Sequence, residues 1–400
     1  MKKNIIFLHL ESLNHTIFNH RQWFPFANKI YNQSLRFNNF ISSATSSLMA
    51  LSDLLHGDDN TLEHNTHLEE NISIHRHNPA LFDVLKQHGY TTAGMGYPKN
   101  WANVDAIWSE TDTFNWYDTS KKMLAEMQQV VSRPEPFALY LWNLSSHLCY
   151  YDDIKKGGAN SLERWQRGYQ SMDFMVGQTI KMLLEAKKLD NTMIVAFGDH
   201  GDDFWGHGFN GGYTHGIEPY TPLVHTPAFI FCPGMKAVDL NHMVSMVDIY
   251  NTVLTLLDIA VAKKTEPHTF ALTPQRRFCY SRNLFAQQKS QHDGSPLRKG
   301  YAITSEHFHV MKIDDQLKMF LWKADPTNHF DILPLIKYKK SGEAYLDLEK
   351  AHSQRTGGIH PHMQHFFSAE MVPLIAQNLH DMKTQLDTWI KNKSQVHPAK

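Results

Sequence analysis

One short segment of the chain places a carboxylate and an imidazole between glycines. Residues 198–201 read Gly-Asp-His-Gly and directly follow the apolar run 193–197. Flanking glycines let the backbone turn sharply, so Asp199 and His200 can both face one divalent cation. A glycine-rich loop with a solvated Asp and His would give the same triplet, and on its own the triplet leaves both interpretations open.

A run of hydroxyl residues forms the second feature with possible chemistry. Residues 42–47 read Ser-Ser-Ala-Thr-Ser-Ser and precede an apolar segment that predicts a helix ending at Gly57. The free N–H groups and the dipole at a helix N-terminus favour an anion. A hydroxyl placed there is either a plain helix cap, which is the commoner role, or a nucleophile whose alkoxide a metal stabilises.

Polar residues also end several apolar runs of strand length. Such runs occupy residues 5–10, 91–95, 137–141, 193–197 and 228–231, and helical patterns occupy residues 79–88, 162–188 and 243–257. Their alternation predicts an α/β fold with a mostly parallel sheet covered on both faces. Function in such sheets lies at the carboxyl ends of the strands, where Glu11, His147 and the Asp199–His200 pair are expected.

Composition excludes several classes of protein. The 400 residues carry 39 Lys and Arg against 40 Asp and Glu, so no basic field favours a nucleic-acid partner. Three cysteines, Cys149, Cys232 and Cys279, cannot build a disulfide framework and indicate a reducing, cytoplasmic location. No apolar stretch approaches the roughly 18 residues of a membrane span, so no transmembrane segment is predicted.

After about residue 262 the sequence becomes polar, proline-bearing and irregular. We therefore expect a catalytic α/β domain over residues 1–262 and a smaller C-terminal subdomain over 263–400, packed on the catalytic body. Alternation on both sides of Asp314 and Asp315 predicts an antiparallel hairpin, and residues 369–391 form an amphipathic terminal helix pattern.

In order and spacing these segments resemble the alkaline phosphatase superfamily, in particular its sulfatase and phosphoethanolamine- and glycerol-phosphate-transferase branch. The resemblance is carried by residues 4–13, 37–57, 198–201, 226–234 and 244–249, and by Tyr169, Asp173 and Gly177. It implies an alkaline-phosphatase-like central sheet flanked by helices, with a small antiparallel C-terminal subdomain.

The same resemblance implies a site built around one metal ion. Glu11 stands where lipoteichoic-acid-synthase-like members carry their acidic ligand, and Asp199 and His200 match the second metal motif. Together with the nucleophile oxygen, these ligands suit Zn²⁺ or Mn²⁺ better than Ca²⁺, which prefers six to eight oxygens.

Three further histidines are assigned to substrate. His147 matches a family histidine that would bind the phosphoryl group or protonate the leaving oxygen. His215 stands where sulfatases often place a substrate-binding lysine, and it could instead serve a second metal. His207 follows the Asp-His pair and is a further candidate for substrate contact.

The nucleophile is where the chain departs from true sulfatases. Those enzymes oxidise a Cys or Ser in a Cys/Ser-x-Pro-x-Arg context to formylglycine, whereas Ser47 is followed by Leu-Met-Ala-Leu. A native hydroxyl is therefore expected. Spacing from Phe37 and Gly57 selects Ser47, while alignment with the transferase pattern Cys-Gly-Thr-Ala-Thr selects Thr45, which is narrowly preferred as both nucleophile and metal ligand.

These inferences predict a metal-dependent phosphoester hydrolase, or a phosphoethanolamine-type head-group transferase, acting through a covalent phospho-Thr or phospho-Ser. The alternatives are a sulfuric ester hydrolase without formylglycine and an inactive, sulfatase-like binding scaffold. The expected partner is a small-molecule or head-group phosphoester. Peripheral or partner-mediated membrane association stays open, and the sequence predicts no oligomeric state.

Overall fold

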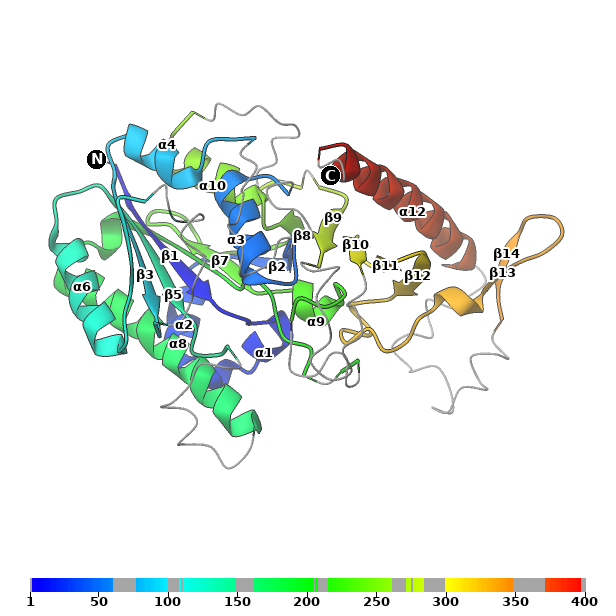
Figure 1. The fold of residues 1–400 in the computed structure, drawn as a ribbon, viewed down its shortest axis with the longest axis horizontal. Helices are drawn as coiled ribbons and strands as arrows, with labels where there is room; N and C mark the ends of the chain where they lie inside the picture. The colour runs from blue at the N-terminus through cyan, green and yellow to red at the C-terminus, as the bar shows by residue number, and fades with distance from the viewer. Residues whose placement is uncertain are drawn as a thin grey trace.

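A mostly parallel β-sheet forms the centre of the protein (Figure 1). The structure is a computed structural model and describes residues 2–59, 77–99, 108, 111–147, 161–204, 206–207, 215–260, 271–274, 276–283, 299–347 and 371–396. Within these residues the main sheet has eight strands in the order β4-β3-β5-β1-β6-β7-β2-β8. Only β7 runs antiparallel to its neighbours, β6 and β2. The predicted α/β fold class is therefore confirmed.

The strands of this sheet are β1 (Asn4–Leu10), β2 (Leu35–Ile41), β3 (Thr91–Tyr97), β4 (Thr113–Trp116), β5 (Phe137–Asn143), β6 (Thr192–Phe197), β7 (Ala228–Phe231) and β8 (Val238–Ser245). The helices around it are α1 (His15–Phe18), α2 (Pro25–Tyr31), α3 (Ser47–His56), α4 (Leu81–Gln87), α6 (Ser120–Ser132), α8 (Ser161–Glu185), α9 (Thr221–Val224) and α10 (Asp248–Leu256), with short 3-10 turns at Arg21–Trp23 and Leu189–Asn191. None of the helices described combines the length and apolar character that crossing a bilayer requires.

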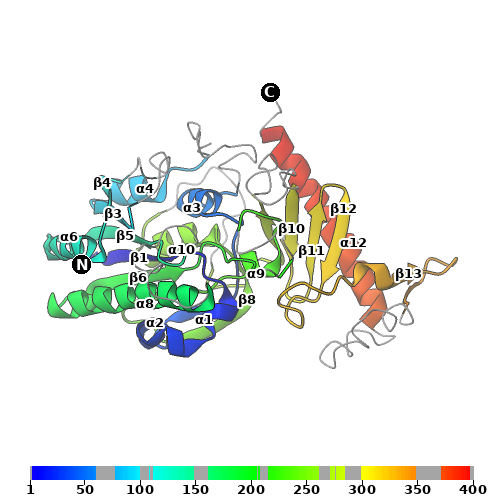
Figure 2. The ribbon, with the colours of Figure 1, turned by 60° about the horizontal axis from the view of Figure 1, so that its bottom comes forward.

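Alternate residues of the central strands pack into two separate hydrophobic cores, because successive side chains of a strand point to opposite faces of the sheet. Ile5 and Phe7 pack with α3, α4 and α10. Ile6 and Leu8 pack with α2, α6 and α8. Figure 2 shows α3 and α4 on one side of the sheet and α2 and α8 on the other. Burial on both faces explains why these strands are almost wholly apolar.

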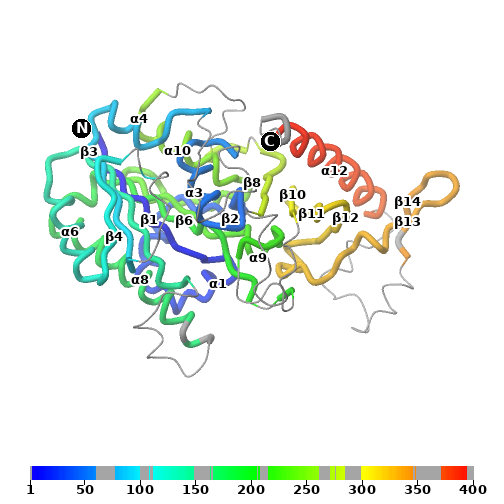
Figure 3. Tube along the Cα trace, in the orientation of Figure 1, coloured from blue at the N-terminus to red at the C-terminus, as the bar shows by residue number. Residues whose placement is uncertain are grey.

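The chain order brings distant segments together at the middle of the sheet. The trace in Figure 3 shows β1, in blue, beside the green β6, and the two strands pair in parallel from Asn4↔Thr192 to His9↔Phe197. All five predicted strands are present. The predicted helix over residues 243–257 was wrong at its start, because Met243 to Ser245 belong to β8, which pairs in parallel with β2.

A second, antiparallel sheet lies beside the main body. Its strands are β9 (Cys279–Arg282), β10 (Gly300–Thr304), β11 (His309–Ile313) and β12 (Gln316–Phe320), followed by a 3-10 turn (Leu333–Leu335), the hairpin β13 (Ile336–Tyr338) and β14 (Ala344–Leu346), and helix α12 (Met371–Val396). One face packs on α12 and the other on the main body (Figure 2). The predicted hairpin and terminal helix are confirmed, and the division at residue 262 stays a prediction.

His309 ties this second sheet to the main body and gives stability a pH dependence. The residue is fully buried, with Nε2 donating to the Pro219 carbonyl (2.9 Å) and Nδ1 accepting from Thr304 Oγ1 (2.8 Å). Burial lowers the pKa of His309 to about 4. The unfolded chain therefore binds more protons below pH 6.5, and the free energy of unfolding should fall by up to ~1.4 kcal/mol per pH unit from there to about pH 4.

Urea unfolding of the wild type and of His309→Gln between pH 7.5 and pH 4.5 measures this contribution. The variant should show a shallower loss of stability below pH 6.5. Equal slopes in the two proteins would contradict the assignment.

Candidate active site

Four side chains from three distant segments meet at the carboxyl ends of β1 and β6. Ser47 Oγ lies 3.0 Å from Glu11 Oε1 and 3.0 Å from His200 Nε2. His200 Nε2 lies 3.3 Å from Asp199 Oδ2 and 3.7 Å from Glu11 Oε1. All four residues are buried. The structure thus brings Glu11, Asp199 and His200 together with the hydroxyl of Ser47, whereas the sequence narrowly preferred that of Thr45.

Glu11 is held in place by donors from neighbouring strands and loops. Its Oε2 accepts a hydrogen bond from Trp142 Nε1 (2.7 Å), and its Oε1 accepts one from Ser12 Oγ (3.1 Å). Burial and the charge of Asp199 raise the pKa of Glu11, but contact with His9 and the histidine charges outweigh them and lower it to about 2. Glu11 is accordingly a carboxylate at neutral pH.

Asp199 and His200 sit on a backbone that passes very close to its neighbours. A Cβ atom added to Gly198 would lie 2.3 Å from the Leu13 carbonyl oxygen, and one added to Gly201 would lie 2.1 Å from that of Pro222. Close approach, rather than the sharp turn expected from the sequence, is therefore what requires these glycines, since neither has a positive φ.

The hydrogen bonds of this segment fix how its side chains present their atoms. Asp199 Oδ1 accepts from the Ser12 backbone N–H (3.1 Å). His200 Nδ1 donates to the Gly201 carbonyl (3.0 Å), and this hydrogen bond turns Nε2 toward Ser47. Burial raises the pKa of Asp199, but the charges of His200 and His9 outweigh burial and hold it well below its usual value.

The two candidate nucleophiles occupy different surroundings. Ser47 is the first residue of α3, which ends at Gly57 in the left-handed conformation (φ 58°), as the sequence predicted. Thr45 is equally buried, but its Oγ1 donates to the Ile217 carbonyl (3.0 Å). Ser47, not Thr45, is therefore the hydroxyl in contact with Glu11 and His200.

A second group of polar side chains adjoins the first. The His215 ring lies 4.2 Å from the His200 ring and 4.8 Å from the His147 ring. His215 Nδ1 donates to Asp202 Oδ1 (2.9 Å). Burial would lower the pKa of His215, but the hydrogen bond and charge of Asp202 outweigh it and raise the pKa. Burial and the charge of His215 lower the pKa of His147 to about 3, so His147 is neutral.

His207 has a different set of neighbours. Its Nδ1 lies 2.5 Å from Asp203 Oδ1, its ring stacks on Tyr220 at 3.4 Å, and its Nε2 lies 3.4 Å from the Asn328 carbonyl of the C-terminal unit. These contacts connect the loop after β6 to that unit. The substrate role predicted for His207 stays a prediction.

Sequence reasoning missed three residues of this region. His9 Nε2 lies 3.1 Å from Asp199 Oδ2 and 3.2 Å from Glu11 Oε2. Asp202 pairs with His215, and Trp142 donates to Glu11. A signal for His9 was available, because a residue two positions before Glu11 on a strand shares its face.

The donor atoms fit a divalent cation. Ligands about 2.0–2.3 Å from a tetrahedral or octahedral ion lie roughly 3.0–3.7 Å from one another, and the spacing of Ser47, His200, Asp199 and Glu11 is 3.0–3.7 Å. Asp199 Oδ2 is buried and has no hydrogen-bond partner among the described residues. A cation would satisfy this oxygen and balance the two carboxylates.

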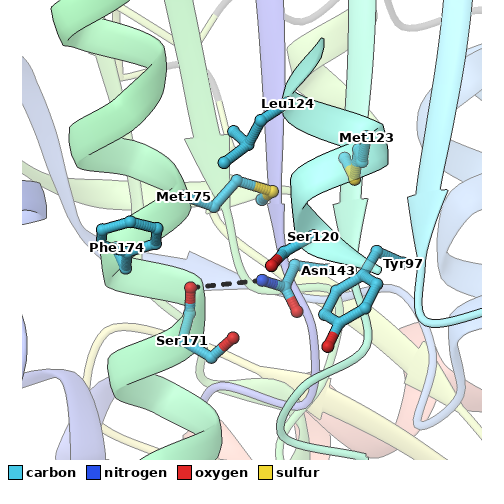
Figure 4. Close-up of a pocket in the computed structure, with 8 residues that line it drawn as sticks. All are labelled: Tyr97, Ser120, Met123, Leu124, Asn143, Ser171, Phe174 and Met175. Carbon is cyan, nitrogen blue, oxygen red and sulfur yellow. Dashed lines mark hydrogen bonds between the residues drawn. The ribbon is translucent and has the colours of Figure 1, made fainter. Parts of the chain in front are cut away.

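A separate hollow lies next to the loop that carries His147 (Figure 4). Asn143 donates to the Ser171 carbonyl there (3.3 Å) and accepts from the Ser145 N–H (2.8 Å). The hollow has a mostly apolar lining, formed by Tyr97, Ser120, Met123, Leu124, Asn143, Ser171, Phe174 and Met175. The two hydrogen bonds of Asn143 hold the start of the loop, and none of the four clustered residues around Ser47 lines this hollow.

Comparison with known proteins identifies the family and the fold. A family model described as Sulfatase matches residues 3–259. No curated protein matches the chain. Among solved structures, a putative sulfatase, yidJ, from Bacteroides fragilis is 15% identical with a TM-score of 0.66, covering 98% of this chain and 96% of its own.

Two further solved structures share the fold. BT4656, solved in complex with its substrate D-glucosamine-2-N,6-O-disulfate, is 14% identical with a TM-score of 0.67, covering 100% of this chain and 99% of its own. A protein in the alkaline phosphatase superfamily from Vibrio parahaemolyticus is 15% identical with a TM-score of 0.59, covering 86% of this chain and 82% of its own. At these identities the likeness concerns the fold alone.

Proposed function

This chain belongs to the sulfatase family of hydrolases, and on that premise we propose that it cleaves a singly charged phosphoester through a covalent phosphoserine at Ser47. One observation carries the proposal: Ser47 Oγ lies 3.0 Å from both Glu11 Oε1 and His200 Nε2, at the first residue of α3. Family membership also favours an enzyme over the inactive scaffold.

A native serine, rather than formylglycine, supports phosphate chemistry. Ser47 is followed by Leu-Met-Ala-Leu, which lacks the Pro and Arg of the oxidation signal. A serine hydroxyl that attacks phosphorus gives a phosphoserine, which water or an acceptor alcohol then resolves. Thr45, whose hydroxyl is turned to the Ile217 carbonyl, is the weaker candidate.

Glu11, Asp199, His200 and Ser47 would hold one divalent cation, for which we favour Zn²⁺ or Mn²⁺. When bound, the cation supplies a Lewis acid that lowers the pKa of the serine hydroxyl and neutralises charge on the ester. The family generally binds a divalent metal. Because Glu11 and Asp199 balance the charge of such an ion, a singly charged ester, as in a phosphodiester, suits the site best.

The remaining steps fall to side chains around the serine. Ser47 Oγ forms the bond to phosphorus as the ester oxygen leaves, and its proton passes to Glu11 Oε1, which lies 3.0 Å away. His215, whose pKa Asp202 raises, gives a proton to the leaving oxygen. In the second step His215 takes a proton from the attacking water. Neutral His147 is placed to donate or accept a hydrogen bond with the ester oxygens.

A panel of aryl esters tests the proposed substrate class. The metal-free protein, reloaded with Zn²⁺ or Mn²⁺, should hydrolyse an aryl phosphodiester faster than the corresponding phosphomonoester or sulfate, and chelation should remove the activity. Adding an acceptor alcohol separates a transferase from a hydrolase by the product formed. A clear preference for the aryl sulfate would overturn the proposal.

Sulfate ester hydrolysis by unmodified Ser47 is the second candidate. It is supported by the fold shared with BT4656, whose substrate is a disulfated glucosamine. A sulfate ester is also singly charged, so the charge argument admits it. The same aryl ester panel decides between the two.

Removing the Asp202–His215 pair should act mainly on turnover. His215→Asn is expected to lower kcat by about 10²-fold, the usual contribution of a general acid, with a smaller change in KM. Steady-state kinetics on an aryl ester and on an ester with a poorer leaving group measure it. The loss should be larger for the poorer leaving group, and equal losses would exclude His215 as the proton donor.

A further inference from the structure

We propose that His9 supplies an additional nitrogen ligand to the cation held by Glu11 and Asp199, an inference that rests on the cation site proposed above. His9 lies two residues before Glu11 on β1, so both side chains point to the same face of the sheet. Its Nε2 lies 3.2 Å from Glu11 Oε2 and 3.1 Å from Asp199 Oδ2.

The His9 ring is fixed by its neighbours in the sheet. It is fully buried and lies between the rings of Trp142 and Phe197, at 4.8 and 5.5 Å and nearly parallel to both. These two residues are its register partners on β5 and β6. A ring packed in this way cannot turn away from the carboxylates without opening the core, so Nε2 is a preorganised donor.

Nε2 lies at ion-pair distance from both carboxylates, where a bound cation would take the place of a proton on the ring. Nε2 and Asp199 Oδ2 are both buried and 3.1 Å apart, yet neither has a hydrogen-bond partner of acceptable geometry in the described part of the chain. Two such polar atoms left facing each other would cost free energy. A cation between the two carboxylates that also binds the Nε2 lone pair would satisfy both Nε2 and Asp199 Oδ2.

Tyr140 completes the arrangement on the other side of the ring. Its hydroxyl lies 3.0 Å from His9 Nδ1. When Tyr140 Oη accepts the Nδ1 proton, Nε2 presents its lone pair to the site, which is how outer partners commonly orient a metal-binding histidine. The site would then offer two nitrogens, two carboxylates and a hydroxyl, a mixed set that favours Zn²⁺ or Mn²⁺ over the all-oxygen preference of Ca²⁺.

Metal binding to the full-length chain tests this assignment without recourse to activity. The variants are His9→Gln and His9→Phe, with His309→Gln as a matched control because His309 is also a fully buried histidine. Zn²⁺ affinity is measured at pH 7.5 by competition with a chelator. Both His9 variants should bind about 100-fold or more weakly, while the control stays within about 3-fold of the wild type.

Pulsed electron paramagnetic resonance of the Mn²⁺-loaded protein counts nitrogen ligands directly. The wild type should show two coupled ¹⁴N nuclei, from His9 and His200, and His9→Gln should show one. A wild type with one coupled nitrogen overturns the inference, and this reading holds even if neither variant folds.

The two proposals fail in different ways. If the wild type takes up no stoichiometric divalent cation, the cation site itself is wrong. If the wild type binds the ion and folded His9 variants bind it equally well, only the role of His9 is wrong.

Discussion

Ser47→Ala is expected to lower kcat by about 10³-fold or more while leaving the fold intact, because it removes the oxygen that bonds to the substrate. Ser47 Oγ is the hydroxyl in contact with Glu11 and His200. Truncation deletes one buried oxygen and creates almost no cavity. The variant should therefore lose kcat while its thermal stability changes little.

Thr45→Val is the matched control for this experiment. It removes a hydroxyl of the same segment, but one that donates to the Ile217 carbonyl rather than to the cluster. We expect it to cost stability, at about 1–3 kcal/mol for the unsatisfied carbonyl, and to keep kcat within about 10-fold. If Thr45→Val abolishes turnover and Ser47→Ala does not, the nucleophile is Thr45.

A trapped intermediate distinguishes covalent catalysis from activation of water. Acid quenching during turnover of a phosphodiester should leave protein carrying one extra phosphoryl group, and peptide mapping should place it on Ser47. Ser47→Ala should accumulate none. A modified peptide that contains the label elsewhere would contradict the assignment.

The sequence predicted the sheet and its reactive edge because both depend on local patterns. Apolar runs that end in polar residues located β1 and β6, and parallel strands bring their carboxyl ends to one edge. Glu11, Asp199 and His200 could thus be placed together without coordinates. The register that sets His9 between Trp142 and Phe197 depends on which strands are neighbours, and no local pattern contains that information.

The choice between Ser47 and Thr45 shows the same limit. The two hydroxyls lie two residues apart in the chain but have different partners. Thr45 Oγ1 donates to the Ile217 carbonyl, which lies more than 170 positions away in the chain. Likewise, residues 243–245 belong to the end of β8 because they pair with β2, and this pairing overrides the helical pattern of residues 243–257. Tertiary context decided each case.

A buried ion pair links the C-terminal sheet to the helix that begins at Ser47. Arg282 of β9 donates to both carboxylate oxygens of Asp53 in α3, at 2.6 and 3.0 Å, and the two side chains are 2% and 0% exposed. The backbones join as well, because Arg282 N–H donates to the Ser43 carbonyl (3.0 Å) and Thr45 N–H donates to the Arg282 carbonyl (3.1 Å). The segment that leads into Ser47 is thus anchored by β9.

Breaking this pair from either side should destabilise the protein strongly. Asp53→Leu and Arg282→Met are each expected to lower the free energy of unfolding by about 3–5 kcal/mol, because each leaves a buried charge without its counterion. The double variant should be more stable than the sum of the single losses predicts, since it removes both charges. Urea unfolding of the four proteins gives the coupling energy.

Arg277→Met is the matched control, because Arg277 pairs with Asp381 at the surface and is 65% exposed. Its expected cost is below about 0.5 kcal/mol. The folded single variants should also lose turnover, because Ser43 and Thr45 would no longer be held against β9. Losses below about 1 kcal/mol, with unchanged kcat, would mean that the C-terminal sheet does not position the nucleophile, and the catalytic body would then have to order residues 42–47 by itself.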